Sequence, residues 1–213
     1  MTQTVWIVRH GHRYDFERPE WFETATRRYD PPLSARGVLQ AKELGKRLQG
    51  EGIDRIVASP FRRTAETAYH VAEALDLPIS LEWGICEWLN PEWMTQMPET
   101  APIEELSADF PRIDRTYHSR ITPTYPETPE SVCWKRTGDT AKQLIEESSG
   151  DLLLVGHGAT LMGIAKALMG GEPEIYAAFC AVLKFVRSGD GWRMELNGDT
   201  SYLSETESKI RFN

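Results

Sequence analysis

The sequence contains only three cysteines, Cys86, Cys133 and Cys180, which lie far apart along the chain. Widely spaced cysteines in odd number form neither a disulfide framework nor the close pairs that bind a structural metal. Thiols of this kind are typical of proteins in a reducing compartment. We therefore expect a cytoplasmic protein.

Long hydrophobic runs and an excess of positive charge are also missing. No apolar run approaches the roughly 20 residues of a membrane-spanning helix, and no charged-then-apolar leader precedes the first strand pattern. The formal net charge of −8 is unfavourable for a general nucleic-acid or anionic-membrane surface. We therefore expect no nucleic-acid or membrane partner, and any anion site must be a local group of cations.

What the chain does contain is an alternation of apolar runs with amphipathic segments, which predicts strands alternating with helices. Predicted strands cover residues 5–8, 53–58, 79–81, 151–156, 181–186 and 192–196. The main predicted helices follow Ser34 and Pro60 and cover residues 131–148 and 159–169. A Ser-Gly-Asp-Gly turn joins the last two strands as a hairpin. The fold prediction is a three-layer α/β/α sandwich, with a mainly parallel sheet and an antiparallel edge.

The length of 213 residues suits a single domain, which we expect to span residues 1–213. A long loop is predicted over residues 14–33, and it is a candidate for a pocket wall. A proline-rich insertion covers about residues 90–130, with a short helix expected at 103–110. Apolar residues scattered through this insertion indicate that it covers the site. The last residues are polar, and we expect them to fray.

Two histidines follow apolar strands in the same local context. His10 stands in the run Arg-His-Gly-His-Arg at residues 9–13, and His157 lies between Gly156 and Gly158. Ligands of open α/β sheets bind outside the carboxyl ends of strands. The two histidines are therefore candidates for one shared pocket.

Arg62 and Arg63 follow the second predicted strand, after Ser59 and Pro60. Pro60 suits the first position of a helix, which would put both arginines in its first turn. Cations are unfavourable there because of the helix dipole. An anion bound between the helix N-terminus and an arginine would explain their placement.

Glu87 is a candidate proton donor because apolar residues flank it, and burial is expected to raise the pKa of its carboxyl group. Four tryptophans lie in or near the candidate site segments: Trp21, Trp83, Trp88 and Trp93. They could form apolar pocket walls or belong to the core.

The run Arg9-His10-Gly11 after a hydrophobic strand resembles the signature of the histidine phosphatase (phosphoglycerate mutase-like) superfamily. The Pro-Pro-Leu-Ser-x-x-Gly segment at 31–37 and the Ser-Pro-x-x-Arg segment at 59–63 are similar to family landmarks, and the second one selects Arg63 rather than Arg62. Arg13 and the segment 84–88 look most like the phosphatase domain of the suppressor-of-T-cell-receptor-signalling proteins.

This resemblance implies a phosphomonoester hydrolase of the histidine acid phosphatase type. It implies that His10 forms a phosphohistidine intermediate, that Glu87 donates a proton to the leaving group and that His157 stabilises the transferred group. The implied phosphate-binding residues are Arg9, Arg13 and Arg63. The chemistry needs no metal or other cofactor, since these cations neutralise the phosphate.

The partner implied by the resemblance is a small-molecule or peptide phosphate ester, bulky or aromatic in its alcohol part. A homodimer is left open. A phosphoglycerate mutase-like enzyme is one alternative. It is disfavoured because His12 stands where mutases have Glu, Ser or Thr, and because no extra basic cluster for a second phosphate is evident. A catalytically silent phosphate-binding module is another. His12 could alter the pH optimum.

A metal-dependent hydrolase is a further alternative, because His10-x-His12 at a strand end resembles the start of some metal sites. Arg9 and Arg13 would repel the cation. We therefore expect phosphatase activity to be undiminished when the protein is assayed in excess EDTA. A loss of activity in EDTA that added divalent metal restores would support the metal-dependent alternative instead.

Overall fold

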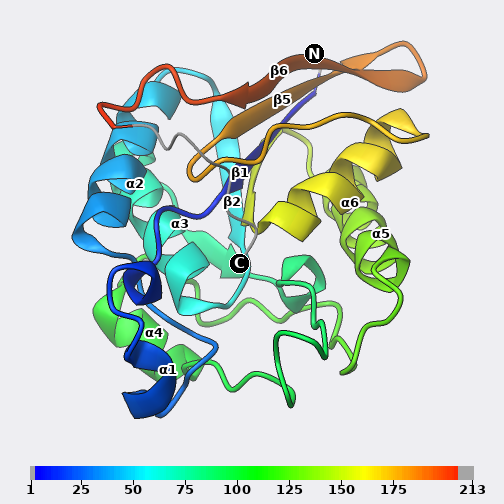
Figure 1. Ribbon diagram of the computed structural model, residues 1–213. Coiled ribbons are helices and arrows are strands. Elements are labelled where there is room, and N and C mark those ends of the chain that lie inside the picture. Colours follow the sequence, from blue (N-terminus) through cyan, green and yellow to red (C-terminus); the bar gives the residue numbers. More distant parts are fainter. Residues whose placement is uncertain (1–2, 206–213) are drawn as a thin grey trace.

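The computed structural model describes residues 3–205 and contains a six-stranded sheet in the order β3-β2-β4-β1-β5-β6 (Figure 1). The strands are β1 (Thr4–Arg9), β2 (Ile53–Ala58), β3 (Ile79–Leu81), β4 (Asp151–Gly156), β5 (Val182–Ser188) and β6 (Gly191–Asp199). The first four are parallel, whereas β5 pairs antiparallel with both β1 and β6. The predicted parallel sheet with an antiparallel hairpin at its edge is confirmed.

Four long helices cover the sheet, two on each face. Helices α2 (Ala35–Leu48) and α3 (Arg62–Leu75) lie on one side, and α5 (Ser131–Glu147) and α6 (Gly158–Met169) lie on the other (Figure 1). Each pair buries an apolar stripe against one face of the strands and so forms two separate core clusters. Both faces of β1 are covered, which explains why its residues are all buried.

Shorter elements lie near the carboxyl ends of the parallel strands. The loop predicted over residues 14–33 contains the 3₁₀ helix η1 (Tyr14–Phe16) and the helix α1 (Trp21–Thr24). The 3₁₀ helix η2 (Trp83–Ile85) follows β3, and α4 (Ile103–Asp109) matches the short helix predicted in the insertion. Helices α1 and α4 lie together below α2 and α3 in Figure 1. The predicted fraying concerns residues 206–213, which lie outside the described residues.

The start of α3 differs from the prediction. The helix begins at Arg62 with Phe61 as its N-cap, so Pro60 precedes the helix instead of occupying its first position. The Phe61 carbonyl accepts the first helical N–H groups, at 3.0 Å from the nitrogens of both Thr64 and Ala65. Arg62 and Arg63 still fall in the first turn, as the sequence predicts. Helix α2 likewise ends at Leu48, a little before the predicted glycines.

Helix α2 approaches the loop after β1 backbone to backbone. A Cβ atom on Gly37 would lie 2.1 Å from the His12 carbonyl oxygen, and one on Gly11 would lie 2.7 Å from the Gly37 carbonyl oxygen. Ser34 caps α2 as predicted, since its hydroxyl accepts the Gly37 N–H at 3.2 Å. Two glycines in contact therefore press the histidine-bearing loop against a rigid helix.

Among the helices of residues 3–205, none is both long enough and apolar enough to span a bilayer.

Candidate active site

His10 and His157 meet because β1 and β4 are parallel neighbours. Arg9 pairs with Gly156 in the register of the two strands, so each histidine is the first residue beyond its strand. The His10 N–H donates to the Gly156 carbonyl at 3.0 Å, and the two imidazole rings lie edge to face with centroids 5.4 Å apart. The predicted convergence of the two histidines is confirmed.

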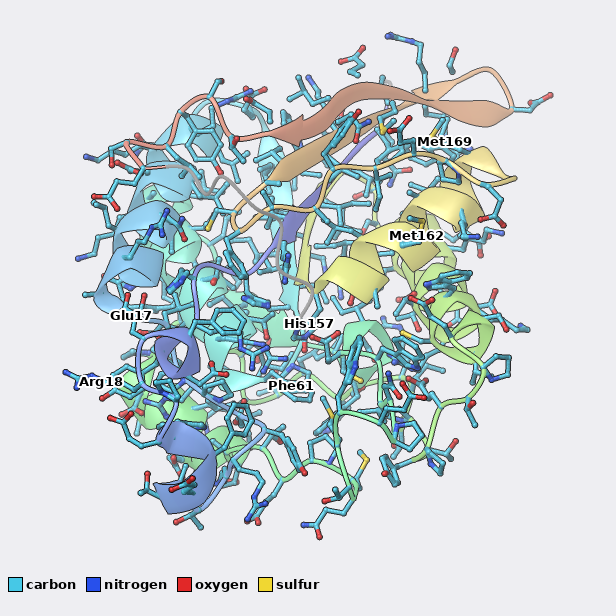
Figure 2. All side chains as sticks on the ribbon, in the orientation of Figure 1. Glu17, Arg18, Phe61, His157, Met162 and Met169 are labelled. Carbon is cyan, nitrogen blue, oxygen red and sulfur yellow. The ribbon has the colours of Figure 1, made fainter. Side chains whose placement is uncertain are left out.

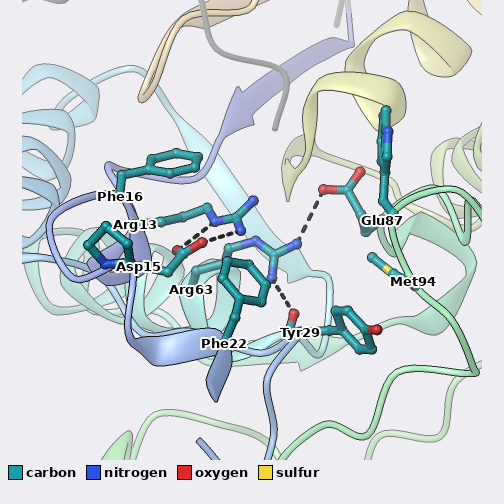
Figure 3. A pocket seen from close by; sticks show the side chains of 10 residues that line it. Arg13, Asp15, Phe16, Phe22, Tyr29, Arg63, Glu87 and Met94 are labelled. Atoms are coloured by element: carbon teal, nitrogen blue, oxygen red, sulfur yellow. Dashed lines mark hydrogen bonds and ion pairs between the residues drawn. The ribbon is translucent and has the colours of Figure 1, made fainter. Parts of the chain in front are cut away.

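Glu87, Arg63 and His157 form a buried triangle of contacts. The Arg63 Nη2 atom lies 3.2 Å from Glu87 Oε2 and 3.2 Å from His157 Nδ1, and the last two atoms are also 3.2 Å apart. All three side chains are almost fully buried. Figure 3 shows Arg63 between Glu87 and the Tyr29 carbonyl, to which it also donates. A guanidinium and a carboxylate are tolerated in this interior because each neutralises the other.

The hydrogen bond of His10 decides its tautomer. Its Nδ1 atom lies 2.8 Å from the carbonyl oxygen of Gly11, which can only accept, so Nδ1 carries the proton. Burial, followed by the charges of Arg63 and Arg9, holds the pKa of His10 well below its usual 6.5. The ring is therefore neutral at pH 7, and its Nε2 atom carries a lone pair. This agrees with the neutral His10 that the sequence predicts.

The expected rise in the pKa of Glu87 is wrong for this arrangement. Burial does act to raise the pKa of Glu87, but His157, Arg63 and the Trp88 N–H outweigh it and hold the pKa well below its usual range. Burial also lowers the pKa of His157 to about 4, with a further decrease from Arg63 and opposition from Glu87. At neutral pH the pair is a carboxylate beside a neutral imidazole. The sequence showed the apolar neighbours of Glu87 but not its cationic contacts.

The other two predicted arginines are held by specific partners. Arg9 is buried, donates from Nη1 to the Ala177 carbonyl at 2.7 Å and lies over the Phe179 ring with 4.3 Å between its Cζ and the ring centroid. Arg13 makes a two-pronged ion pair with Asp15, at 3.0 Å and 2.6 Å (Figure 3). This fork places Arg13 in the wall of the same pocket that Arg63 and Glu87 line, and its predicted role in phosphate binding stays a prediction.

A pocket of about 260 Å³ opens in front of Arg63 and Glu87 (Figure 3). Its polar lining consists of Arg13, Asp15, Arg63 and Glu87, and its apolar lining consists of Phe16, Pro19, Phe22, Tyr29, Trp93 and Met94. The predicted roles of the 14–33 loop and of the insertion as site walls are therefore confirmed. His10 and His157 are buried and are not part of this lining.

The four candidate tryptophans occupy different positions, and one of them lines the pocket. Trp93 lines the pocket, and Trp88 packs edge-on against it with ring centroids 5.0 Å apart. Trp83 packs against Phe61 in a small core cluster. Trp21 lies beside a neighbouring cleft instead.

Within residues 3–205, His10, Glu87 and His157 form a group that could hold a metal ion, since one donor atom from each lies within 4.8 Å of the other two. The Arg63 guanidinium touches two of these three residues, at 3.2 Å from each. A divalent cation would face that fixed positive charge at short range, so the donor set is a poor fit to a metal. His12 is not in this group, and its Nδ1 atom lies 2.9 Å from the Ser34 hydroxyl.

Sequence reasoning assigned no role to Ser59 or Phe179. The Ser59 hydroxyl lies 2.8 Å from His157 Nε2 and holds the ring from the side opposite Glu87. The Phe61 ring packs edge-on against His157 at 5.3 Å between centroids, and Figure 2 labels both residues. Ser59 stands in the Ser-Pro segment and could have been found there. Phe179, which touches Arg9, His10 and His12, lies far away in sequence and carried no signal.

The sheet is mainly parallel and lies between helices, and two imidazoles, a carboxylate and buried guanidiniums meet near the ends of its parallel strands. This arrangement defines an α/β protein with a site suited to bind an anion. The match of residues 5–200 to the model of the histidine phosphatase superfamily (branch 1) narrows this class. The chain belongs to that superfamily, as the Arg9-His10-Gly11 resemblance implied.

The chain is also similar to individual proteins of other organisms. The chain is 32% identical over 181 residues to the transcription factor tau 55 kDa subunit of Saccharomyces cerevisiae and 28% identical over 208 residues to the ecdysteroid-phosphate phosphatase of Drosophila melanogaster. Each match covers 80% of this chain, but only 42% and 27% of those longer proteins. The crystal structure of the ecdysone phosphate phosphatase of Bombyx mori, with tungstate, has the same fold, with a TM-score of 0.75, 23% identity and coverage of 99% and 98% of the two chains.

The pKa of His157 predicts how stability depends on pH. Because its folded-state pKa of about 4 lies below the usual 6.5, the unfolded chain binds more protons as the pH falls, and stability decreases from about pH 6.5 downward. Between pH 7 and pH 5, we expect the unfolding free energy of the wild type to decrease by about 2 kcal/mol more than that of His157→Gln. Urea denaturation at both pH values measures this. The exposed His118→Gln is the matched control. Equal decreases in unfolding free energy for the wild type and His157→Gln would contradict the prediction.

Proposed function

We propose that this protein hydrolyses phosphate monoesters through a phosphohistidine on His10. The observation that carries the proposal is the hydrogen bond from His10 Nδ1 to the Gly11 carbonyl, which leaves the lone pair on Nε2. A neutral imidazole aimed by a fixed backbone acceptor is suited to attack phosphorus. Membership of the histidine phosphatase superfamily and the named phosphatase relatives support the same reaction.

Arg63, Arg9 and His157 are the proposed partners of the phosphate oxygens. Guanidinium groups match phosphate in geometry and charge, and each charge-assisted hydrogen bond contributes about 1.5–3 kcal/mol. A phosphate dianion would replace the Glu87 carboxylate as the partner of Arg63 and His157. Arg13, held by Asp15 at the wall of the pocket, adds a third guanidinium near the entering group.

This exchange of partners would allow the Glu87 carboxylate to become protonated and to act as the proton donor. Its pKa is low because Arg63 and His157 contact it. When phosphate takes those contacts and brings its own negative charge, the burial of Glu87 is no longer offset, and its pKa rises. A protonated Glu87 then lies beside the ester oxygen that must leave.

The proposed reaction has two steps. The His10 Nε2 lone pair attacks phosphorus while the bond to the ester oxygen breaks, and Glu87 transfers its proton to that oxygen. Water then attacks the phosphorus of the phosphohistidine while the bond between phosphorus and His10 Nε2 breaks, and Glu87 accepts a proton from the water. His10 is thereby regenerated, and inorganic phosphate leaves. His157, with Ser59 behind it, stabilises the charge of the transferred group in both steps.

The apolar wall of the pocket supports an ester with a bulky or aromatic alcohol part, whether a small molecule or a phosphopeptide. Phe22 and Trp93 stand on opposite segments at the mouth and are each partly exposed. The arginines of the lining are already paired with Asp15 and Glu87. A mutase substrate with a second anionic group would meet aromatic rings and carboxylates here, so we propose hydrolysis.

Removal of the nucleophile tests the reaction class. We expect His10→Ala to hydrolyse p-nitrophenyl phosphate at least about 10³-fold more slowly than the wild type, because no covalent intermediate forms. Mass spectrometry after a rapid quench at alkaline pH should find a phosphorylated peptide that contains His10 in the wild type only. The exposed His118→Ala should retain full activity and labelling. Equal rates for the wild type and His10→Ala would refute an enzymatic role for this site.

A substitution in the apolar wall of the pocket tests whether the substrate has an aromatic alcohol part. We expect Trp93→Ala to raise KM for a naphthyl phosphate by about tenfold, since part of the apolar contact with the leaving group is lost. The KM for ethyl phosphate, which is too small to reach this wall, should stay within about twofold of the wild type. Tyr176→Ala, an exposed aromatic residue outside the pocket lining, is the control. An equal effect on both esters would argue against an aromatic substrate.

A further inference from the structure

We infer that Arg136 and Glu127, which lie outside the pocket, are positioning residues that aim Glu87 at the ester oxygen. This inference rests on the proposed role of Glu87 as proton donor. Both side chains are buried, with 8% and 2% of their surface exposed. They form a two-pronged ion pair, with Arg136 Nε and Nη2 at 2.6 Å and 2.8 Å from the two Glu127 oxygens.

The rest of the Arg136 guanidinium binds the backbone that carries Glu87. Its Nη1 atom donates to the carbonyls of Gly84 at 3.0 Å and Cys86 at 3.2 Å, and lies 3.4 Å from that of Trp83. Its Nη2 atom donates to the carbonyl of Glu87 itself at 3.1 Å. One guanidinium group therefore contacts four backbone carbonyls within five consecutive residues. These contacts satisfy backbone carbonyls of η2 and of the two residues that follow it, and so help to fix the conformation of the segment that carries Glu87.

Glu127 holds the segment immediately after Glu87. Its Oε2 atom accepts the Leu89 N–H at 3.1 Å, and its own N–H donates to the Leu89 carbonyl at 3.0 Å. Its carbonyl accepts the indole N–H of Trp88 at 2.8 Å. The two members of the pair thus hold the backbone on both sides of the proposed acid.

This arrangement sets the direction of the Glu87 side chain. Its carbonyl faces Arg136, whereas its carboxylate contacts Arg63 and His157. Helix α5 provides a rigid base for Arg136, because Thr140 packs so closely on Gly84 that a Cβ atom there would lie 2.3 Å from the Thr140 hydroxyl oxygen. A displacement of about 1 Å at a catalytic group is enough to reduce a rate about 100-fold.

Two esters whose leaving groups differ in basicity can distinguish a positioning role from a merely structural one. An acid is needed when the departing alcohol is strongly basic, and hardly at all when a stabilised phenolate departs. Benzyl phosphate and p-nitrophenyl phosphate have rings of similar size but differ in this respect. The ratio of their kcat/KM values therefore reports proton donation, whereas partial unfolding lowers both values equally.

The experiment compares four variants with these two esters. We expect Arg136→Lys and Glu127→Gln to lower kcat/KM for benzyl phosphate by about 10–100-fold and for p-nitrophenyl phosphate by no more than about threefold. Glu87→Gln should show the same selectivity, at least as strongly. Leu144→Ala, which opens a cavity in the buried face of the same helix, should lower both values by the same factor through loss of folded protein.

The outcomes distinguish the two levels of the proposal. If Glu87→Gln is selective for the leaving group and neither variant of the pair is, the positioning inference is wrong and the proposed reaction stands. If Glu87→Gln affects both esters equally, the assignment of Glu87 as the acid fails, and the inference fails with it. Should Arg136→Lys not fold by circular dichroism, Glu127→Gln decides alone, since it keeps the shape and the hydrogen-bond acceptor oxygen of the side chain.

Discussion

The contact among Arg63, Glu87 and His157 is the interaction on which the site depends. A guanidinium and a carboxylate have been removed from water, which is tolerable only while each offsets the charge of the other. The contact holds the pKa of Glu87 low and keeps it ionised, whereas burial holds the pKa of His157 low and keeps it neutral although Glu87 acts in the opposite direction. Both protonation states are opposite to those that our proposed reaction requires. A phosphate group that enters this contact would reverse both at once. We propose that substrate binding itself thereby sets the protonation states for the reaction.

The fold brings this contact and the neighbouring His10 together from four separate parts of the chain. Parallel pairing of β1 and β4 sets the two histidines side by side, and the first turn of α3 supplies Arg63. Glu87 reaches them from the segment after η2, whose backbone is bound by Arg136 and Glu127. Close packing of Gly11 on Gly37 holds the loop of His10. Rigid elements therefore surround every group of the proposed mechanism.

The pocket in front of the contact has a different character. Its walls come from the 14–33 loop and from the insertion. Helix α1, which belongs to the 14–33 loop, contains no buried residue. Aromatic rings face the space where the alcohol part of an ester would lie, and Phe179 packs behind the site against Arg9 and the rings of His10 and His12. In our proposal Arg63 and Glu87 at the inner end of the pocket act on the phosphate group, whereas the walls set the substrate preference.

Apolar periodicity predicted the alternation of strands and helices and the antiparallel hairpin, because it is a local property. Short motifs, together with the family resemblance, singled out His10, Arg63, Glu87 and His157. The three-dimensional arrangement was needed to establish the protonation of Glu87 and the fork between Arg13 and Asp15. It also decided which tryptophan lines the pocket and how Arg136 holds the segment of the acid. These depend on distances between residues far apart in the chain, and charge interactions change steeply with distance and burial.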